Sequence, residues 1–352
     1  MNKPGKILLF HTAFPGDIVL VEPALEALHR GFPRARLSVV TVPSASGVLL
    51  HHPAVGELIV YDKRGAERGG RGMLNLAARL RRERFDLAVV PHRSLRSALI
   101  VRLAAIPRRI GFSTSAGRFL FTDVVAYDSD IHEIQRNLSL LRPVGIEPVP
   151  GARPTLYPDD SDRTAVDGLV ASRFGPDGTI GGRELIALAP GSVWNTKRWP
   201  REHFARLGQM LIDRGFAIAL IGGGEDRDLC EWMELEIGGA PVLNAAGRLT
   251  LLQSAELLRR CRALVSNDSA PVHLGVSVRT PVVAIFGPTV PAFGFAPPGN
   301  DNEVVERRGL PCRPCSIHGG KVCPIKTFVC MEEITPDAVF ARVLARLRLA
   351  EA

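Results

Sequence analysis

The 352-residue chain has few aromatic residues and no long apolar run. It contains three Trp and three Tyr, and its basic residues do not alternate with aromatic ones as a base-stacking nucleic-acid surface would require. No apolar run approaches the roughly 20 residues of a membrane-spanning helix. The sequence therefore argues against both a nucleic-acid-binding protein and an integral membrane protein.

A recognisable secretory leader is also lacking. The apolar block Lys6–Phe10 is short, and Pro15-Gly16-Asp17 interrupts the segment without a small-residue cleavage site. We therefore expect a cytoplasmic protein. The net charge of +8 suits an anionic partner, although an arginine-rich proteome explains it equally well.

Length and periodicity predict two Rossmann-like α/β domains. The chain is too long for one hydrophobic core, and apolar runs alternate with amphipathic segments, as in parallel sheets with right-handed crossovers. We expect strands at Ile7–Phe10, Leu37–Val42, Glu57–Tyr61, Leu87–Val90, Leu185–Ala189, Ala217–Ile221, Val242–Asn244, Ala263–Ser266 and Val282–Phe286. The clearest helices are expected at Pro23–Gly31, Met73–Arg84, Glu202–Arg214, Arg227–Ile237 and Leu251–Arg260.

The domain boundary is predicted within residues 151–183, where two Pro- and Gly-containing stretches flank a short helix. We expect an N-terminal domain over residues 1–172 and a C-terminal domain over residues 183–332. Thr335-Pro336 then supplies an N-cap and a first-turn proline for a last helix, over residues 335–350.

The most informative segment follows the predicted strand Leu185–Ala189. It reads Pro190-Gly191-Ser192, then Lys197, and Trp199-Pro200 opens the next helix. Such a loop offers backbone N–H groups, the lysine offers a point charge, and the helix N-terminus carries partial positive charge. The segment therefore predicts a site for the phosphates of a substrate.

Three further strand ends in this half suit a nucleotide. Gly222-Gly223-Gly224-Glu225 permits close backbone approach and offers a carboxylate to ribose hydroxyls, or forms only a flexible turn. Asn267-Asp268-Ser269 makes a second anion site or simply caps the helix that follows. Phe286-Gly287-Pro288-Thr289 ends the next strand. Because ligands of open α/β sheets bind beyond the carboxyl ends of strands, the four ends together predict a nucleotide crevice.

In the N-terminal half, Asp17 follows the first predicted strand. A carboxylate at that place can act as a general base toward a substrate hydroxyl. Spacing alone favours the alternative of a helix N-cap. No G-x-G-x-x-G follows this strand, which counts against a nicotinamide cofactor.

The ordered set of motifs resembles the lipopolysaccharide heptosyltransferases of glycosyltransferase family nine, over about residues 6–350. The set comprises Gly16-Asp17 with Pro23-Ala24-Leu25, Pro190-Gly191-Ser192 with Lys197-Arg198-Trp199-Pro200, Asn267-Asp268-Ser269 with His273, and Phe286-Gly287-Pro288-Thr289. The Lys-Arg-Trp-Pro string is more similar to the heptosyltransferase II branch than to the I branch. The resemblance implies a GT-B fold, with two Rossmann-like domains facing each other across a cleft and the last helix returning to the N-terminal domain.

The resemblance also implies the reactants and their binding residues. The donor would be ADP-L-glycero-β-D-manno-heptose in the C-terminal domain, and the acceptor would be the inner core on lipid A, bound by the N-terminal domain at the inner membrane surface. Asp17 would be the catalytic base, and Lys197 would bind the diphosphate. The other donor-binding positions would be Gly16, Ser192, Thr196, Glu225, Asp268, Ser269, Ala270 and His273. No cofactor is implied, and we expect a monomer.

The implied reaction is one inverting displacement. Asp17 would take a proton from the acceptor hydroxyl, while Lys197 and the amides near Ser269 stabilise the departing ADP. Three Asp-x-Asp strings are present, but the resemblance and Lys197 favour a metal-independent reaction. Ala270 departs from the family's usual glycine, and would cost about 1 kcal/mol if that backbone needed a positive φ.

The acceptor carries acidic sugars and phosphates, so basic side chains should line its site. Candidates are Arg93 and Arg96, which follow the strand Leu87–Val90 together with His92, and His132 further on. For each of these residues a solvated surface position is an equal alternative.

Four of the six cysteines form the pattern Cys312-x2-Cys315-x7-Cys323-x6-Cys330. Four thiolates can hold structural zinc or an iron–sulfur cluster, although the x7 and x6 gaps are not a standard finger spacing. Reduced thiols that pack a loop are the favoured interpretation, a metal site comes second, and disulfides come last.

Other functions are compatible with the sequence. They are a heptosyltransferase I or III with a different core acceptor, another nucleotide enzyme such as an NDP-sugar epimerase, and a non-catalytic nucleotide-sugar-binding protein. A binding protein should tolerate Asp17→Asn, whereas a transferase should not.

Overall fold

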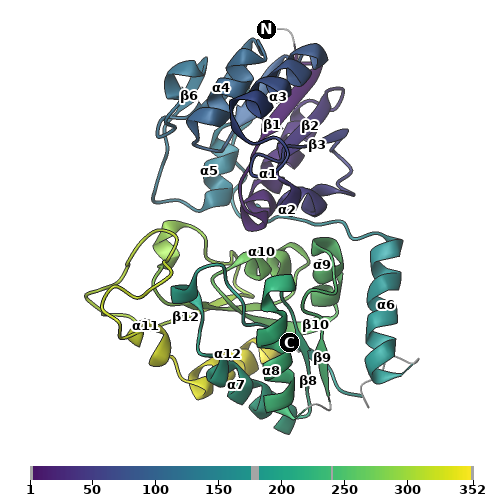
Figure 1. Ribbon diagram of the computed structural model, residues 1–352, viewed down its shortest axis with the longest axis vertical. Helices are drawn as coiled ribbons and strands as arrows, with labels where there is room; N and C mark the ends of the chain where they lie inside the picture. The colour runs from purple at the N-terminus through teal and green to yellow at the C-terminus, as the bar shows by residue number, and fades with distance from the viewer. Residues whose placement is uncertain (1–2, 176–181, 239–240, 350–352) are drawn as a thin grey trace. The chain divides into compact units, whose positions relative to one another are not determined.

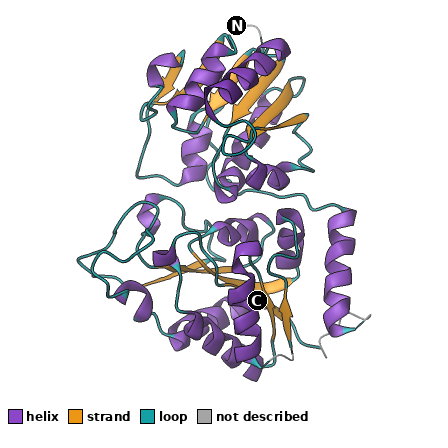
Figure 2. Ribbon diagram, in the orientation of Figure 1, coloured by secondary structure: helices purple, strands orange, loops and turns teal. Residues whose placement is uncertain are grey.

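The computed structural model describes residues 3–175, 182–238 and 241–349, and the chain divides into two units, Met1–Tyr157 and Pro158–Ala352. Each unit contains one six-stranded parallel sheet with helices around it (Figure 1, Figure 2). The expected pair of Rossmann-like α/β domains is confirmed.

In the first unit the strand order is β3-β2-β1-β4-β5-β6. The strands are β1 (Lys6–Phe10), β2 (Arg36–Thr41), β3 (Glu57–Val60), β4 (Leu87–Val90), β5 (Arg108–Phe112) and β6 (Asp123–Val125). The helices are α1 (Pro15–Gly31), α2 (Pro43–Ser46), α3 (Gly69–Glu83), α4 (Leu95–Leu103) and α5 (Glu133–Ser139), with 3₁₀ turns η1 (Gly47–Leu49), η2 (Arg118–Leu120) and η3 (Arg142–Val144). A sheet covered on both faces selects continuous apolar strands, and β4 is buried throughout.

Two strands of this sheet, β5 and β6, escaped sequence analysis. Their sequences are short, and each begins with a charged residue rather than an apolar one. The charges pair across the sheet, because Arg108 Nη2 lies 3.0 Å from Asp123 Oδ1. A strand that begins with charged residues in this way shows little of the apolar run that identifies a buried strand.

Helix α1 begins at Pro15, well before the predicted start at Pro23, which lies inside the helix and is buried. A proline inside a helix lacks its amide donor, so the sequence suggested a start there instead. Phe14 is the N-cap residue, and the Asp17 carboxylate accepts the Phe14 backbone N–H at 3.1 Å. Asp17 is therefore not the N-cap that spacing alone favoured; it is the third residue of the helix, and its carboxylate accepts the N–H of the N-cap residue Phe14.

In the second unit the strand order is β12-β11-β10-β7-β8-β9. The strands are β7 (Leu185–Ala189), β8 (Ala217–Leu220), β9 (Val242–Asn244), β10 (Cys261–Asn267), β11 (Val282–Phe286) and β12 (Glu303–Glu306). The helices are α6 (Asp160–Phe174), α7 (Arg201–Asp213), α8 (Arg227–Ile237), α9 (Leu251–Arg259), α10 (Ala270–Ser277), α11 (Val329–Glu332) and α12 (Pro336–Leu349), with turns η4 (Asn195–Lys197), η5 (Gly224–Asp226) and η6 (Pro291–Phe293). Figure 1 shows α7, α8 and α12 on one face of this sheet and α9 and α10 on the other.

The two helices that flank the second domain differ from expectation. Helix α6 packs against α9, and Arg173 Nε donates to the Val242 carbonyl at 2.7 Å, so the boundary lies before α6 and not after it. The structure also corrects the expectation that the last helix packs on the N-terminal domain. Val339, Val343 and Leu347 of α12 are buried in the core of the second unit, against α7 and β10. An amphipathic pattern identifies a buried face but not its partner.

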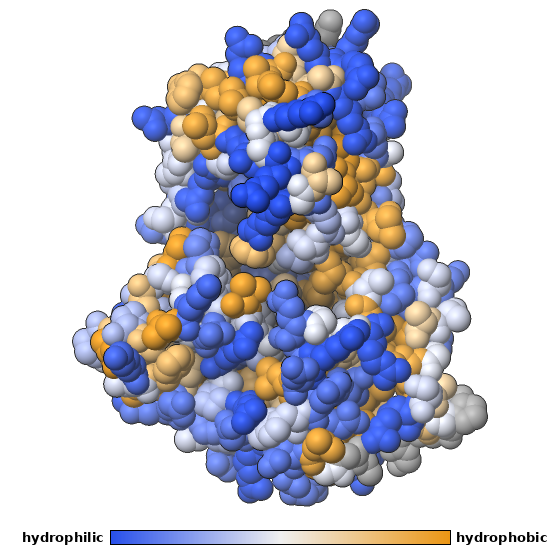
Figure 3. All heavy atoms as spheres, in the orientation of Figure 1, coloured by the Kyte–Doolittle hydropathy of each residue, from blue (hydrophilic) through white to orange (hydrophobic). Residues whose placement is uncertain are grey.

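Hydrophilic and hydrophobic side chains are interspersed on the face of each unit shown in Figure 3. Among the residues described by the structure, no helix has the length and apolar character needed to cross a membrane.

Candidate active site

The second unit changes the direction of its chain between β7 and β10. These strands are neighbours, but β7 leads on to β8 at one side, while β10 leads on to β11 at the other. In open α/β sheets such a switch point leaves a crevice beyond the carboxyl ends of the two strands. The loops after β7 and β10 both carry predicted site residues.

Lys197 and Asp268 meet at this switch point. Lys197 ends η4 in the loop after β7, and its Nζ lies 2.6 Å from Oδ2 of Asp268, which follows β10. The Thr289 hydroxyl donates to the same Oδ2 at 2.7 Å. The Lys197 and Asp268 side chains are only 12% and 8% exposed. Three strand ends are thereby joined through one carboxylate oxygen.

The buried Asn267 side chain fixes both sides of the Lys197 loop. Its Nδ2 donates to the Pro190 carbonyl at 2.7 Å, and its Oδ1 accepts the Trp199 backbone N–H at 3.0 Å. The Trp199 indole is buried and donates to the Ile334 carbonyl at 2.8 Å. Because both ends of the loop are anchored, the position of Lys197 is set by the fold.

Thr196 is engaged with a distant segment of the same unit. Its N–H and hydroxyl both donate to the Gly320 carbonyl at 3.0 Å, and the Gly320 N–H is 2.7 Å from the Thr196 hydroxyl oxygen. Gly319 has a φ of +84°, and a Cβ there would lie 3.1 Å from Lys197 Cγ. The predicted donor residue Thr196 thus serves first to hold the Lys197 loop.

The start of α10 matches the predicted anion site in part. The Ser269 side chain does not cap the helix and instead donates to the Gly191 carbonyl at 3.4 Å. Ala270 lies in the first turn, with no positive φ, so its methyl group brings none of the backbone strain considered above. His273 is buried on the same helix, and Ser192 is buried in the facing loop.

Two glycines, one in the loop after β7 and one in the loop after β8, leave space for the Asp226 side chain. A Cβ at Gly191 would come 2.3 Å from Asp226 Oδ1, and one at Gly222 would come 2.7 Å from Asp226 Cβ. These glycines therefore accommodate Asp226, which corrects the interpretation of Gly222 as an approach point for a ligand. Glu225 is exposed on η5, and its contact with a ribose stays a prediction.

In the first unit, Asp17 and the buried Gly16 lie in the first turn of α1. Glu133 of α5 lies near enough that the Asp17 charge acts on it. Burial raises the pKa of Glu133 to about 7, Arg136 opposes that rise, and Asp17 adds to it. Arg136 Nε is 3.1 Å from Glu133 Oε2.

The predicted acceptor residues have different environments. Arg93 is exposed, with its guanidinium carbon 4.5 Å from the centre of the Tyr127 ring. Arg96 is exposed in the first turn of α4 and contributes to the positive field at Lys63. His132 caps α5, since its Nδ1 accepts the Ile134 N–H at 3.2 Å.

Sequence analysis missed Lys63 and Thr12. Lys63 Nζ donates to the Thr12 carbonyl at 2.5 Å, and the Thr12 hydroxyl is 3.2 Å from His92 Nδ1. Burial, then the charges of Lys63 and Arg93, lower the pKa of His92 to about 4. This group lies at the carboxyl ends of β1, β3 and β4, and the signal in the sequence was Lys63-Arg64 just beyond a predicted strand.

The model of glycosyltransferase family 9 (heptosyltransferase) matches residues 73–324. The chain belongs to this family. Lipooligosaccharide heptosyltransferase 2 of Haemophilus ducreyi is 29% identical over 315 residues, which cover 86% of this chain and 88% of that protein. The structure of Escherichia coli ADP-heptose LPS heptosyltransferase II has a TM-score of 0.80 at 26% identity, covering 99% of this chain and 100% of that one.

A family 9 glycosyltransferase from Veillonella parvula has a TM-score of 0.87 at 22% identity, with 99% of each chain covered. These likenesses confirm the GT-B fold class. Lys197 and Asp268 both lie within the residues that the family model matches.

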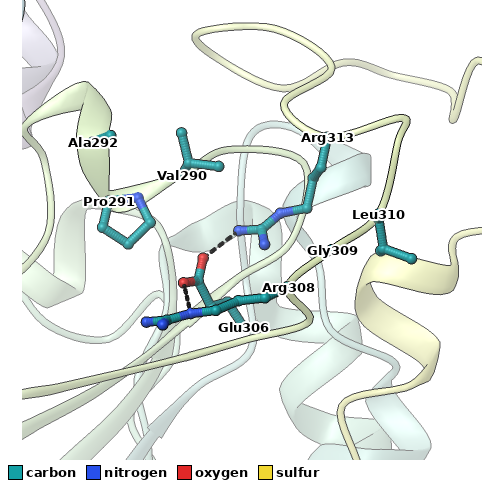
Figure 4. Close-up of a pocket in the computed structure, with 8 residues that line it drawn as sticks. All are labelled: Val290, Pro291, Ala292, Glu306, Arg308, Gly309, Leu310 and Arg313. Atoms are coloured by element: carbon teal, nitrogen blue, oxygen red, sulfur yellow. Dashed lines mark hydrogen bonds and ion pairs between the residues drawn. The ribbon is translucent and has the colours of Figure 1, made fainter.

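The second unit has a cavity of about 400 Å³ beside the loop that carries Thr289 (Figure 4). It is lined by Val290, Pro291, Ala292, Glu306, Arg308, Gly309, Leu310 and Arg313. Figure 4 shows Arg308 and Arg313 both reaching Glu306. Arg313 also donates to the carbonyls of Gly287 and Thr289, so it joins its own segment to the loop after β11.

Proposed function

We propose that the chain transfers L-glycero-D-manno-heptose from ADP-heptose to heptosyl-Kdo2-lipid A, as a heptosyltransferase of type II. The reaction is inverting and metal-independent. The observation that carries the proposal is the pairing of Lys197 with Asp268 at a switch point, in a chain whose relatives are named heptosyltransferase 2. A transferase of type I or III is the alternative.

Lys197 acts on the donor. Negative charge grows on the diphosphate as the anomeric carbon–oxygen bond breaks, and a fixed ammonium nearby lowers the energy of that state. Asp268 and Thr289 hold Lys197 before the donor arrives, so little reorganisation is needed. The N-terminus of α10 adds its partial positive charge on the same side of the switch point.

Asp17 acts on the acceptor. Its carboxylate is held by the Phe14 N–H and takes the proton of the attacking hydroxyl. Glu133 has a pKa near 7, so close to neutral pH it carries a proton in about half of the molecules. A neutral Glu133 limits the negative charge around Asp17 when the anionic acceptor binds.

The acceptor contributes carboxylates and phosphates of the inner core at the membrane surface. Lys63, Arg93 and Arg96 provide cations at the carboxyl ends of β3 and β4 that suit such groups. His92 is neutral at physiological pH, so it offers hydrogen bonds rather than charge. We propose that this cluster, and not His132, holds the acidic sugars.

The test is ADP release from ADP-heptose with heptosyl-Kdo2-lipid A or with Kdo2-lipid A as acceptor. The proposal expects release with the first acceptor, and a fall of about 10²- to 10⁴-fold in Asp17→Asn with donor binding retained. Asn keeps an oxygen for the Phe14 N–H, so the variant should fold. Release only with Kdo2-lipid A would reassign the chain to type I. Absence of donor binding would overturn the proposal.

A further inference from the structure

Residues 312–330, here called the cysteine segment, take no part in the mechanism above. Cys315 is exposed and Cys312 is partly exposed, whereas Cys323 and Cys330 are buried, and all four thiols are free. Side chains at the surface gain little by apolar packing, so the expected role of packing a loop does not account for Cys312 and Cys315.

The four thiols of the segment gather in one place. Cys315, Cys312 and Cys323 all lie close enough to Cys330 to interact electrostatically with its thiol. Cys315 is likewise influenced by Cys312 and Cys323. The spacing in the sequence thus brings four sulfur atoms into mutual electrostatic range.

The chain around Cys323 is shaped to stabilise a thiolate. Burial raises the pKa of the Cys323 thiol, but the backbone N–H groups of residues 325–328 outweigh that rise and lower the pKa overall. Lys326 and Phe328 adopt left-handed φ values of 58° and 49°. Non-glycine residues adopt this conformation at an energetic cost, and two of them within one turn indicate a functional constraint. Amide groups wrapped around a sulfur atom supply the partial positive charge that a metal-bound thiolate needs.

The segment is tied to the loops around Lys197 and Thr289 at its start and near its middle. Arg313 donates to the Thr289 carbonyl at 2.7 Å, and the Cys315 N–H donates to the Pro288 carbonyl at 2.9 Å, so one end is fixed to the loop after β11. Gly320, near the middle of the segment, exchanges hydrogen bonds with Thr196. Anything that orders the cysteine segment therefore orders the Lys197 loop.

We propose that Cys312, Cys315, Cys323 and Cys330 bind one thiophilic divalent metal ion, Zn²⁺ or Fe²⁺, and that this ion orders the segment that holds Thr196 and Lys197. Binding exchanges thiol protons for the ion, with release of the protons to solvent and no change of oxidation state. The ion is structural, so the metal-independent displacement is unaffected. Only the effect on Lys197 rests on the proposed function.

Metal binding requires a movement of the segment. Tetrahedral Zn–S bonds of about 2.3 Å place sulfur atoms about 3.8 Å apart. Among the described residues, no three of these sulfur atoms lie within 4.8 Å of one another. Since Cys315 is exposed and Cys330 is packed in the core, the turn at Cys312 and Cys315 moves inward onto Cys323 and Cys330.

The first test measures metal without substrate. The reduced full-length chain is reconstituted with Zn²⁺ or Fe²⁺, desalted and assayed by elemental analysis, which also distinguishes the two ions. We expect about one ion per chain, also in the control variants Cys230→Ser and Cys261→Ser, whose thiols are buried elsewhere. The double variant Cys315→Ser, Cys323→Ser should lose at least nine-tenths of the bound metal. The proposal would be overturned if the wild-type chain retained no metal after desalting, or if the double variant retained as much metal as the wild type.

A second test needs no variant. Co²⁺ added to the wild-type chain should produce the intense visible absorption of tetrahedral thiolate coordination, and Zn²⁺ should abolish it. Trypsin should cleave after the exposed Lys321 at least tenfold more slowly in the loaded than in the chelated protein. Absence of the absorption or equal cleavage would contradict the proposal. Neither readout depends on heptosyl transfer, so its failure is distinguishable from failure of the proposed function.

Discussion

One oxygen of Asp268 serves two partners, since Oδ2 lies 2.6 Å from the Lys197 ammonium and accepts the Thr289 hydroxyl at 2.7 Å. Lys197 and Asp268 are 71 residues apart in the chain. The carboxylate holds the lysine in place, and in the proposed reaction it would still be hydrogen-bonded to Thr289 when Lys197 binds a phosphate. This arrangement leads directly to the first prediction.

Lys197→Met should lower kcat for ADP release by about 10²- to 10³-fold, because the charge that stabilises the leaving group is lost. Asp268→Asn should cost less, about tenfold, since Lys197 keeps its charge but loses its ionic partner. If the two act as a unit, the double variant will cost less than the product of the single effects. If the fold-losses in kcat of the two single variants simply multiply in the double variant, the coupling is contradicted. Lys3→Met serves as a control at an exposed lysine.

Gly319→Ala and Gly309→Ala form a matched pair for the contact between the cysteine segment and Lys197. Both glycines have positive φ, +84° and +76°, so either alanine should destabilise by about 1 kcal/mol. A Cβ at 319 lies 3.1 Å from Lys197 Cγ, whereas a Cβ at 309 has no atom within 4 Å. Thermal unfolding should shift similarly in both, and only Gly319→Ala should lower kcat. Equal kcat in the two variants would argue against positioning of Lys197 by this segment.

Asn267→Ala should lower the free energy of unfolding of the chain by about 2–4 kcal/mol, since it leaves the Pro190 carbonyl and the Trp199 N–H without their partner. Urea unfolding followed by Trp fluorescence measures the loss. Asn195→Ala, at an exposed position of the neighbouring turn, should stay within about 0.5 kcal/mol of wild type. A comparable loss in both variants would refute the anchoring role of Asn267.

The raised pKa of Glu133 makes stability depend on pH in a defined direction. The folded state binds this proton more tightly than the unfolded chain, so the stability gained from Glu133 is full below about pH 4.5 and declines as the pH rises through about 7. At about 1.4 kcal/mol per unit the decline amounts to roughly 3 kcal/mol. Unfolding free energies at pH 5 and pH 8 should differ less in Glu133→Gln than in wild type. The same difference in both proteins would disprove the assignment.

Much of the fold could be predicted from local patterns. Buried strands such as β7 and β11 are continuous apolar runs, and their ends marked the loops that carry Lys197 and Thr289. The buried stretch of β10 likewise marked the loop that carries Asp268. The expectation that these loops lie at one edge of the sheet needed only the rule that ligands of open α/β sheets bind beyond the carboxyl ends of the strands. Strands β5 and β6 escaped prediction because each begins with charged residues and lacks a long continuous apolar run.

Other features depend on contacts between distant parts of the chain. The amphipathic pattern of α12 predicted a buried face, but packing alone placed that face against α7 and β10. Likewise, Thr196 and Gly320 lie 124 residues apart, and Lys63 and Thr12 lie 51 apart. Periodicity reports which side of an element is buried, because it reflects the local helix or strand repeat. The sequence by itself determined the two sheets and the strand-end motifs, whereas strand order and helix packing decided which of those motifs meet.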